Sequence, residues 1–296
     1  VDRIYDRPFD SPRMAAITRF VPELVAHYAI PMYRRQIAGF GRSSYDLILI
    51  VNGQTLATEF LSELRVAYPT ARVVLYLWDS IDNRRSARTN LALVDRCLSF
   101  DPQDVRAYHL IQRPLFFTHQ FETPSALPQD IDISFVGTAH TDRAAIVKRV
   151  DAALSKDLRR YWYLFLQAPW VFLARKVIDR RMKGCHRSDF AFVPLPGDSL
   201  RSIFFRSRSI LDIEHPRQRG LTMRTFETIG ARRKLITTNA NIRDYDFYDS
   251  RNICVVDRER LPHFNSSFFN EEYHLLSDEL YRYYSISGWL ESVVGS

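Results

Sequence analysis

Several polar side chains follow directly after strand-like runs and are the first candidates for chemistry. The run 209–213, SILDI, has the length and composition of a strand, and Glu214, His215 and Pro216 follow it. A proline stops strand pairing, so Glu214 and His215 should lie at the carboxyl end of that strand. A carboxylate beside an imidazole at this position has no obvious packing role and suits proton transfer. We therefore expect Glu214 and His215 to be catalytic.

A basic turn and a helix come next and predict an anion site. The turn 217–220 is RQRG, and 222–231 predicts a helix, which a buried strand at 234–238 follows. Helix N-termini attract phosphate, and a nearby guanidinium adds a fixed charge and paired donors. A carboxylate in the same helix can accept two vicinal ribose hydroxyls. The expected nucleotide-binding residues here are Arg217, Gly220, Thr222, Arg224 and Glu227. A plainer interpretation stays open for two of these residues. Arg217 can be a solvated charge in the turn, and Glu227 can be an exposed helix residue that pairs with Arg224.

A glycine-containing turn elsewhere in the chain offers a second anion site. The run 132–136, DISFV, is followed by Gly137-Thr138-Ala139-His140 and by a helical segment from about residue 142. A short turn between a buried strand and a helix can bring backbone N–H groups to a phosphate. We expect Gly137, Thr138 and Arg143 to contribute to the nucleotide site. His140 is a candidate general base, although a simple turn residue explains it better.

A third strand end, in the first half of the chain, supplies Asp79. The run 72–78, RVVLYLW, ends at Asp79-Ser80, and the earlier run 46–51, DLILIV, ends at Asn52-Gly53. Asp79 is a candidate catalytic carboxylate. A cap for the following helix explains this residue equally well.

The order of the elements determines where these residues lie. Apolar runs that alternate with helical segments predict parallel strands buried on both faces, before residue 119 and again after residue 130. Between them, 119–130 loses the apolar periodicity and contains two prolines. We therefore expect an α/β fold with two Rossmann-like, doubly wound domains, 1–124 and 125–296. Their strand ends should face a shared cleft, where ligands bind.

The net charge and the composition limit the kinds of partner and the cellular location that we expect. The chain has 296 residues, a net charge of +7 and a pI near 9.4, which favours an anionic partner such as a nucleotide, a phospholipid or a nucleic acid. Its cysteines, Cys97, Cys185 and Cys254, lack metal-ligand spacing, so we expect reduced thiols and a cytoplasmic location. No apolar run reaches the ~18 residues that a membrane span requires.

Three segments carry a resemblance to a known family. They are 211–248, LDIEHPRQRGLTMRTFETIGARRKLITTNANIRDYDFY, with LYLWDSID at 75–82 and DISFVGTAHTDR at 132–143. Together they resemble bacterial glycosyltransferases of capsular-polysaccharide and lipopolysaccharide biosynthesis that have the GT-B fold. The resemblance implies a nucleotide-sugar donor in the C-terminal domain, with donor roles for Glu214, Arg224 and Glu227. It implies a glycan or lipid-linked acceptor in the N-terminal domain, and it requires neither a metal ion nor a cofactor besides the nucleotide sugar.

The sequence departs from that family in two places. The first strand-helix unit of the N-terminal domain, with its glycine-bearing loop, is absent before Val1, so we expect part of the acceptor site to be missing from this chain. The closely spaced pair of glutamates found in many retaining members is also absent. Retention and inversion of the anomeric configuration therefore both stay open.

One further stretch combines aromatic and basic residues. The segment 159–183, RRYWYLFLQAPWVFLARKVIDRRMK, is too short in its apolar part to cross a bilayer, but it suits the interface of the inner membrane. A buried helix pair hinged at Pro169 explains it equally well. Nucleic-acid binding is the least favoured interpretation, because no recognised nucleic-acid motif accompanies the pattern. We therefore expect no nucleic-acid partner.

A glycosyltransferase is the leading hypothesis, and two rivals remain. A sugar-nucleotide epimerase or hydrolase of the same fold would turn over a nucleotide sugar without an acceptor. A non-catalytic membrane- or nucleic-acid-binding protein would show no affinity for nucleotide sugars, and its binding would fall steeply with salt.

Overall fold

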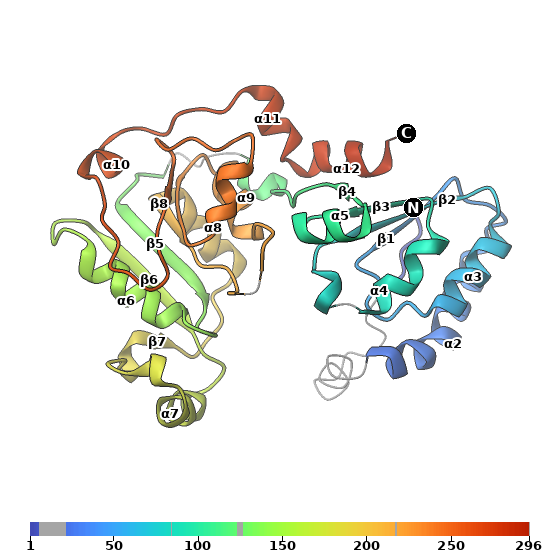
Figure 1. The fold of residues 1–296 in the computed structure, drawn as a ribbon, viewed down its shortest axis with the longest axis horizontal. Helices are drawn as coiled ribbons and strands as arrows, with labels where there is room; N and C mark the ends of the chain where they lie inside the picture. The colour runs from blue at the N-terminus through green and yellow to red at the C-terminus, as the bar shows by residue number, and fades with distance from the viewer. Residues whose placement is uncertain (6–21, 84, 123–126, 217, 296) are drawn as a thin grey trace. The chain divides into compact units, whose positions relative to one another are not determined.

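The chain divides into two compact units, which a computed structural model describes for residues 1–5, 22–83, 85–122, 127–216 and 218–295 (Figure 1). Unit 1 consists of Val1–Pro114 with Leu290–Ser296, and unit 2 of Leu115–Trp289. The division thus lies before the expected linker at 119–130. Phe116 and Phe117 belong to unit 2 because both contact its C-terminal part. Phe117 pairs in parallel with Ser285, and the ring centroid of Phe116 lies 4.6 Å from that of Trp289.

Unit 1 contains a four-stranded parallel sheet in the order β1-β2-β3-β4. Its strands are β1 (Leu47–Val51), β2 (Arg72–Leu77), β3 (Arg96–Ser99) and β4 (Ile111–Gln112). Its helices are α2 (Pro22–Phe40), α3 (Thr58–Ala67), α4 (Arg85–Asn90) and α5 (Pro102–Tyr108). Its 3-10 turns are η1 (Ile81–Asn83) and η2 (Leu91–Leu93). The apolar run of β2 is buried along almost its whole length, as expected of a strand covered on both faces. Phe60 and Leu61 of α3 pack with Val73 of β2 in the core.

Unit 2 contains a six-stranded parallel sheet in the order β10-β9-β8-β5-β6-β7. Its strands are β5 (Ile131–Thr138), β6 (Arg160–Phe165), β7 (Phe190–Ala191), β8 (Ser207–Asp212), β9 (Lys234–Thr237) and β10 (Ile253–Val255). Its helices are α6 (Arg143–Ala153), α7 (Pro169–Ile178), α8 (Gly197–Arg206), α9 (Met223–Gly230), α10 (Ser266–Asn270), α11 (Asp278–Tyr283) and α12 (Ile286–Val294), whose last residues belong to unit 1. The 3-10 turns are η3 (His119–Phe121), η4 (Arg180–Met182), η5 (Arg187–Asp189) and η6 (Ala240–Asp244).

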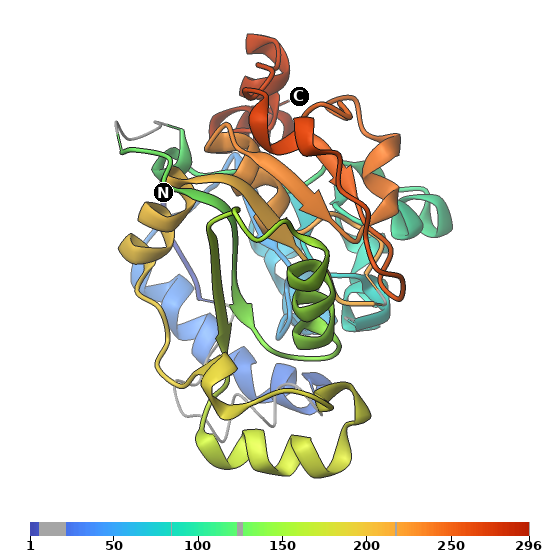
Figure 2. The same cartoon turned by 90° about the vertical axis from the view of Figure 1, so that its left-hand side faces the viewer.

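The order of these strands creates a switch point in the middle of the sheet. From β5 the chain proceeds outward to β6 and β7, then returns to β8 on the other side of β5 and proceeds outward to β9 and β10. Figure 2 shows β5 and β8 side by side, with α6 in front of the sheet. The crevice at the carboxyl ends of two such strands is where open α/β sheets bind ligands.

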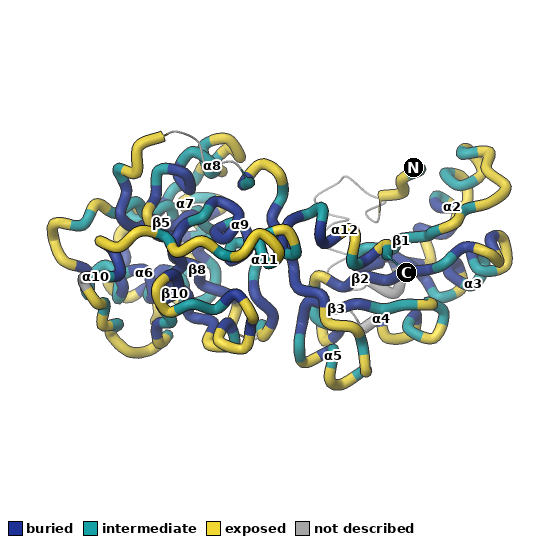
Figure 3. Tube along the Cα trace, turned by 90° about the horizontal axis from the view of Figure 1, so that it is seen from above, coloured by how far each residue is buried: buried dark blue, intermediate teal, exposed yellow. Residues whose placement is uncertain are grey.

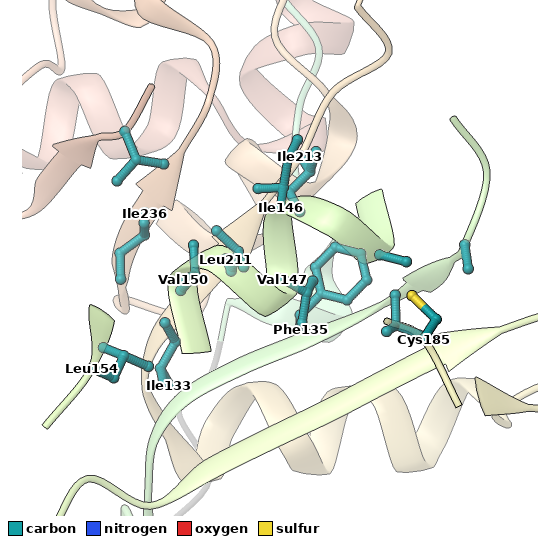
Figure 4. Close-up of a cluster of buried hydrophobic side chains, with 14 of the residues drawn as sticks. Ile133, Phe135, Ile146, Val147, Val150, Leu154, Cys185, Leu211, Ile213 and Ile236 are labelled. Atoms are coloured by element: carbon teal, nitrogen blue, oxygen red, sulfur yellow. The ribbon is translucent and has the colours of Figure 1, made fainter. Parts of the chain in front are cut away.

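The core of unit 2 holds these strand ends rigidly. Ile133 and Phe135 of β5 and Leu211 of β8 pack with Ile146 and other residues of α6 in one buried cluster (Figure 4). The strands β5, β8 and β9 are largely buried, whereas the segment 271–276 between α10 and α11 is largely exposed (Figure 3). None of the described helices is both long and apolar enough to cross a membrane.

The aromatic and basic stretch 159–183 is not a helix pair hinged at Pro169. Its first part is the strand β6, paired with β5 and β7, and only its second part is helical, as α7 and the 3-10 turn η4. Tyr161, Trp162 and Tyr163 are aromatic residues in succession, which is a composition typical of strands. The proline begins α7 instead of bending it, since the first helical turn needs no N–H donor there.

Candidate active site

The site lies in unit 2, at the carboxyl edge of β5 and β8. Gly137 and Thr138 end β5, and Asp212 ends β8. The helices α6 and α9 begin just beyond these strands, so the positive ends of both helix dipoles point to the same edge. The fold thus gathers two of the segments that the sequence singled out.

Two histidines meet at this edge. The ring centroids of His140 and His215 are 6.2 Å apart, although the residues lie on different strand-helix connections. His215 is exposed, and His140 is partly buried. Burial, with a smaller contribution from the charge of Arg143, lowers the pKa of His140 to about 4. His140 is therefore neutral at neutral pH, and its ring is a weaker base than an ordinary imidazole.

Glu214 is held in a network of ion pairs. Its side chain is buried, and its Oε1 lies 2.7 Å from Nη2 of Arg258. Thr238 donates its hydroxyl to the other carboxylate oxygen. Arg258 also donates through Nη1 to Asp142 at 2.8 Å. Both oxygens of Glu214 are thus occupied by protein donors, which suits a positioning role better than proton transfer.

Arg143 joins the two strand ends. Its Nε donates to the carbonyl of Ile213 at 2.8 Å, and its Nη1 donates to the carbonyl of Thr138 at 3.2 Å. Burial lowers the pKa of this guanidinium, while the charge of Asp212 opposes that shift. A Cβ at Gly137 would lie only 3.0 Å from the ring of Phe135, so a side chain there would crowd that ring, and it would lie in ordinary contact, at 3.5 Å, with Nη1 of Arg143.

The start of α9 is capped by a small hydroxyl network. Thr222 is the N-cap residue, and its hydroxyl accepts from the backbone N–H of Thr225. The hydroxyls of Thr222 and Thr225 both donate to Oδ2 of the buried Asp212, at 2.7 and 2.9 Å. The carbonyl of Gly220 accepts from the side chain of Gln218 at 3.0 Å, which closes the preceding turn. Thr222 therefore shapes the helix N-terminus that a phosphate would face.

Arg224 and Glu227 follow one helical turn apart on α9. The guanidinium of Arg224 lies 5.1 Å from the ring centroid of Phe204, and its buried Nη1 has no hydrogen-bond partner among the described residues. The carboxylate of the partly buried Glu227 makes no hydrogen bond to any side chain that the structure describes. Burial raises the pKa of Glu227, although Arg224 lowers it. A buried polar atom without a partner requires an explanation, and a bound ligand or an ordered water is one such explanation for Nη1 of Arg224.

The other candidates lie outside this cluster. Arg217 falls outside the described residues. Asp79 belongs to unit 1, where it follows β2 and accepts the backbone N–H of Ser80 at 3.0 Å. Near it, burial raises the pKa of Asp104 to about 6, although this carboxylate accepts the N–H of Ile81 at 2.8 Å. A cleft shared by the two units stays a prediction.

Four site residues were not anticipated from the sequence: Asp142, Asp212, Thr238 and Arg258. Asp212 had a detectable signal, since it is a carboxylate at a strand end. Arg258 had none, because it reaches Glu214 across 44 residues of chain. In the described part of the chain, no group of three or more histidine, cysteine, aspartate or glutamate side chains could hold a metal ion.

Comparison with known proteins identifies the fold. No protein-family model matches the chain, and no curated protein matches it in sequence. Sucrose-phosphate synthase from Thermosynechococcus elongatus matches with a TM-score of 0.54 at 12% identity, over 99% of this chain and 76% of that one. α,α-Trehalose 6-phosphate synthase from Burkholderia multivorans matches with a TM-score of 0.51 at 12% identity, over 97% and 71%.

A third structure supports the same conclusion. Anabaena Alr3699/HepE, solved in complex with UDP and glucose, matches with a TM-score of 0.50 at 9% identity, over 79% of this chain and 68% of that one. Identities this low establish the fold alone. The chain has the α/β fold with two Rossmann-like domains that GT-B glycosyltransferases share.

Proposed function

We propose that the chain is a glycosyltransferase that moves a sugar from a nucleotide-sugar donor to a glycan or lipid-linked acceptor. The reaction would serve the synthesis of a bacterial surface polysaccharide, such as capsule or lipopolysaccharide, at the cytoplasmic face of the inner membrane. One observation carries the proposal. At the switch point of the unit 2 sheet, α9 presents a buried guanidinium nitrogen of Arg224 and the carboxylate of Glu227, and neither has a hydrogen-bond partner among the described residues.

These two groups fit the two parts of a nucleotide sugar. A carboxylate accepts hydrogen bonds from the two vicinal hydroxyls of a ribose, which is the role of Glu227. A guanidinium at a helix N-terminus pairs with a diphosphate, which is the role of Arg224. The turns that bear Gly137, Thr138, Gly220 and Thr222 would frame the same phosphates, and Arg143 adds a second buried cation.

The chemistry follows from this arrangement. The bond between the anomeric carbon and the diphosphate oxygen breaks, and the leaving diphosphate keeps the electron pair. The acceptor hydroxyl oxygen forms the new bond to the anomeric carbon and loses its proton. The two arginines and the helix dipoles stabilise the charge that develops on the leaving group, so we propose that no metal ion or further cofactor is needed.

The base that removes the acceptor proton is proposed among three residues. His140 and His215, whose ring centroids lie 6.2 Å apart at the sheet edge, are the candidates in unit 2 if the reaction inverts. Asp79 is the candidate in unit 1. Glu214 would act indirectly by positioning Arg258.

Calorimetry with cytidine, uridine, guanosine, adenosine and deoxythymidine diphosphates tests the proposal. We expect one of them to bind. We then expect Glu227→Ala to weaken that binding between about tenfold and about a hundredfold, the value of one strong hydrogen bond to a charged group, without lowering the melting temperature. Glu271→Ala, which removes an exposed carboxylate of the same unit, is the matched control. Unchanged affinity in Glu227→Ala would remove the donor-site assignment.

A second pair of variants tests the diphosphate contact. We expect Arg224→Gln to weaken binding of the nucleoside diphosphate but not of the bare nucleoside. Arg232 also stacks on an aromatic ring, 5.0 Å from the centroid of Tyr281, but it lies beyond the other end of α9. Arg232→Gln should therefore leave both affinities unchanged. Equal losses in the two variants would indicate general electrostatics and not a phosphate contact. Release of free sugar without an acceptor would instead indicate a hydrolase.

A further inference from the structure

Helix α7 presents an apolar face to solvent. Trp170 is 70% exposed, Leu173 61%, Val177 88% and Ile178 82%, which are high values for such large apolar side chains. The first three follow a spacing of three and four residues, so they lie on one side of the helix. Phe172, on the opposite side, is only 4% exposed and packs against Phe190. The exposed face is therefore the side of α7 that its own unit leaves uncovered, at the end of the unit beyond β7 (Figure 1).

The segment that contains this face carries more cations than anions. Residues 169–183 contain five lysines and arginines and one acidic residue, Asp179, a net charge of +4. Asp179 is already engaged, since Arg175 and Arg181 both pair with its carboxylate. Arg180 and Lys183 are exposed, and their side chains have no partner among the described residues. An open hollow beside this face is lined by Ile178 and by the charged residues Arg175, Asp179, Arg180 and Arg181.

Hydrogen bonds fix α7 to the rest of unit 2, and some of them reach the loop of the candidate active site. Arg175 donates hydrogen bonds to the backbone carbonyls of Ala139 and Thr141, the two neighbours of His140. Lys176 donates to the carbonyl of Cys185 at 3.1 Å. The apolar face is thus already ordered before any partner binds, and Arg175 links its helix directly to the loop that carries His140.

We propose that this face of α7 docks the protein on an anionic membrane surface. Tryptophan and aliphatic side chains along one side of a helix insert at the boundary between headgroups and acyl chains, where the flanking cations pair with lipid phosphates. Arg180 and Lys183, which are exposed and have no partner among the described residues, are therefore available to pair with lipid phosphates. The inference narrows the membrane contact of 159–183 to α7 and η4, and it does not depend on the reaction.

Co-sedimentation of the full chain with lipid vesicles tests this docking. We expect binding to vesicles of phosphatidylcholine mixed with phosphatidylglycerol, and little binding to phosphatidylcholine alone. The double variant Leu173→Glu with Val177→Glu should weaken binding by about tenfold or more for each side chain removed from the acyl boundary. Arg180→Glu with Lys183→Glu should weaken it about fivefold for each cation lost. All four side chains are exposed, so melting temperatures should not change.

Matched controls place the same changes elsewhere. Val66→Glu alters an apolar residue that is 82% exposed on α3, and Arg106→Glu with Lys156→Glu reverses two exposed cations far from α7 in the sequence. We expect both controls to bind vesicles as the parent chain does. The proposal is overturned if the parent chain does not bind anionic vesicles, or if the α7 variants bind as well as the controls. It is also overturned if the chain self-associates through α7 instead, which ultracentrifugation would detect as a complex that Leu173→Glu dissolves.

Discussion

Replacing Arg258 with methionine tests whether the network beneath the candidate site is structural. Arg258 contacts two carboxylates at once, Glu214 at 2.7 Å and Asp142 at 2.8 Å. The side chains of Glu214 and Asp142 are only 7% and 16% exposed, and that of Arg258 is 19% exposed. Methionine keeps much of the length of the arginine stem but removes all of its donors and its charge. The variant therefore leaves two largely buried carboxylates without their cation.

The cost follows from the burial of these groups. Removing one partner of a buried ion pair destabilises a protein by ~3–5 kcal/mol, and the residual exposure of Arg258 favours the lower end of this range. A loss of ~3 kcal/mol lowers the melting temperature of a domain of this size by ~6–12 °C. Burial by itself raises the pKa of Asp142, but the hydrogen bond and charge of Arg258 bring it below its ordinary value. That stabilisation is present above the unfolded-state pKa and is lost as the pH falls through the lowered folded-state value.

Urea denaturation of four proteins would measure these effects: the parent chain, Glu214→Gln, Arg258→Met and the double variant. We expect the double variant to be more stable than the sum of the single losses implies, with a coupling free energy above ~1 kcal/mol. We also expect Arg258→Met to reduce nucleotide affinity, because Asp142 and Glu214 border the strand ends of the site. Additive losses, or an unchanged melting temperature in Arg258→Met, would refute the network and return Glu214 to the list of candidate bases.

Three further outcomes are expected. The folded-state pKa of Asp104 is raised to about 6, so the folded state binds more protons than the unfolded state between about pH 4 and pH 6. Stability therefore falls as the pH rises through that window. Asp104→Asn should raise the melting temperature at neutral pH but not near pH 4. The pKa of His140 is lowered to about 4, so its ring should remain neutral in an NMR titration down to about that pH, and a midpoint near 6.5 would contradict the buried position. Gly230→Ala would place a methyl group 2.6 Å from Phe117 and should lower the free energy of unfolding by ~1–3 kcal/mol. In the control Gly197→Ala the methyl group has no neighbouring atom within 4 Å, so that variant should be as stable as the parent chain or more stable. Equal melting temperatures of the two variants would contradict the packing of Gly230 against Phe117.

The sequence predicted the elements whose patterns are local. The runs at 46–51 and 72–78 became β1 and β2, and the unit from residue 209 to residue 238 became β8, α9 and β9. The expected α/β fold with two Rossmann-like domains is confirmed. Buried parallel strands carry continuous apolar runs, so neighbouring residues alone reveal them. The strand at 160–165 was harder to predict, because its arginine and its run of aromatic residues hide the same strand signal.

The candidate site required information from distant residues. The sequence located Arg224, Glu227 and the glycine turn after β5, since helix starts and strand ends have local signatures. It did not reveal that both oxygens of Glu214 are occupied, since Arg258 and Thr238 are remote in the chain. It also did not reveal that His140 and His215 lie 6.2 Å apart.

The sequence by itself determined the type of those elements whose apolar pattern is local, and the kinds of chemical group at their ends. Only the tertiary structure decided which ends meet. The sheet order places β8 directly beside β5, with Ser207 paired to Ile131 and Ser209 paired to Ile133, although two strands and three helices separate them along the chain. The physical reason is that strand pairing and core packing depend on the whole unit at once, whereas a sequence pattern reports only on neighbouring residues.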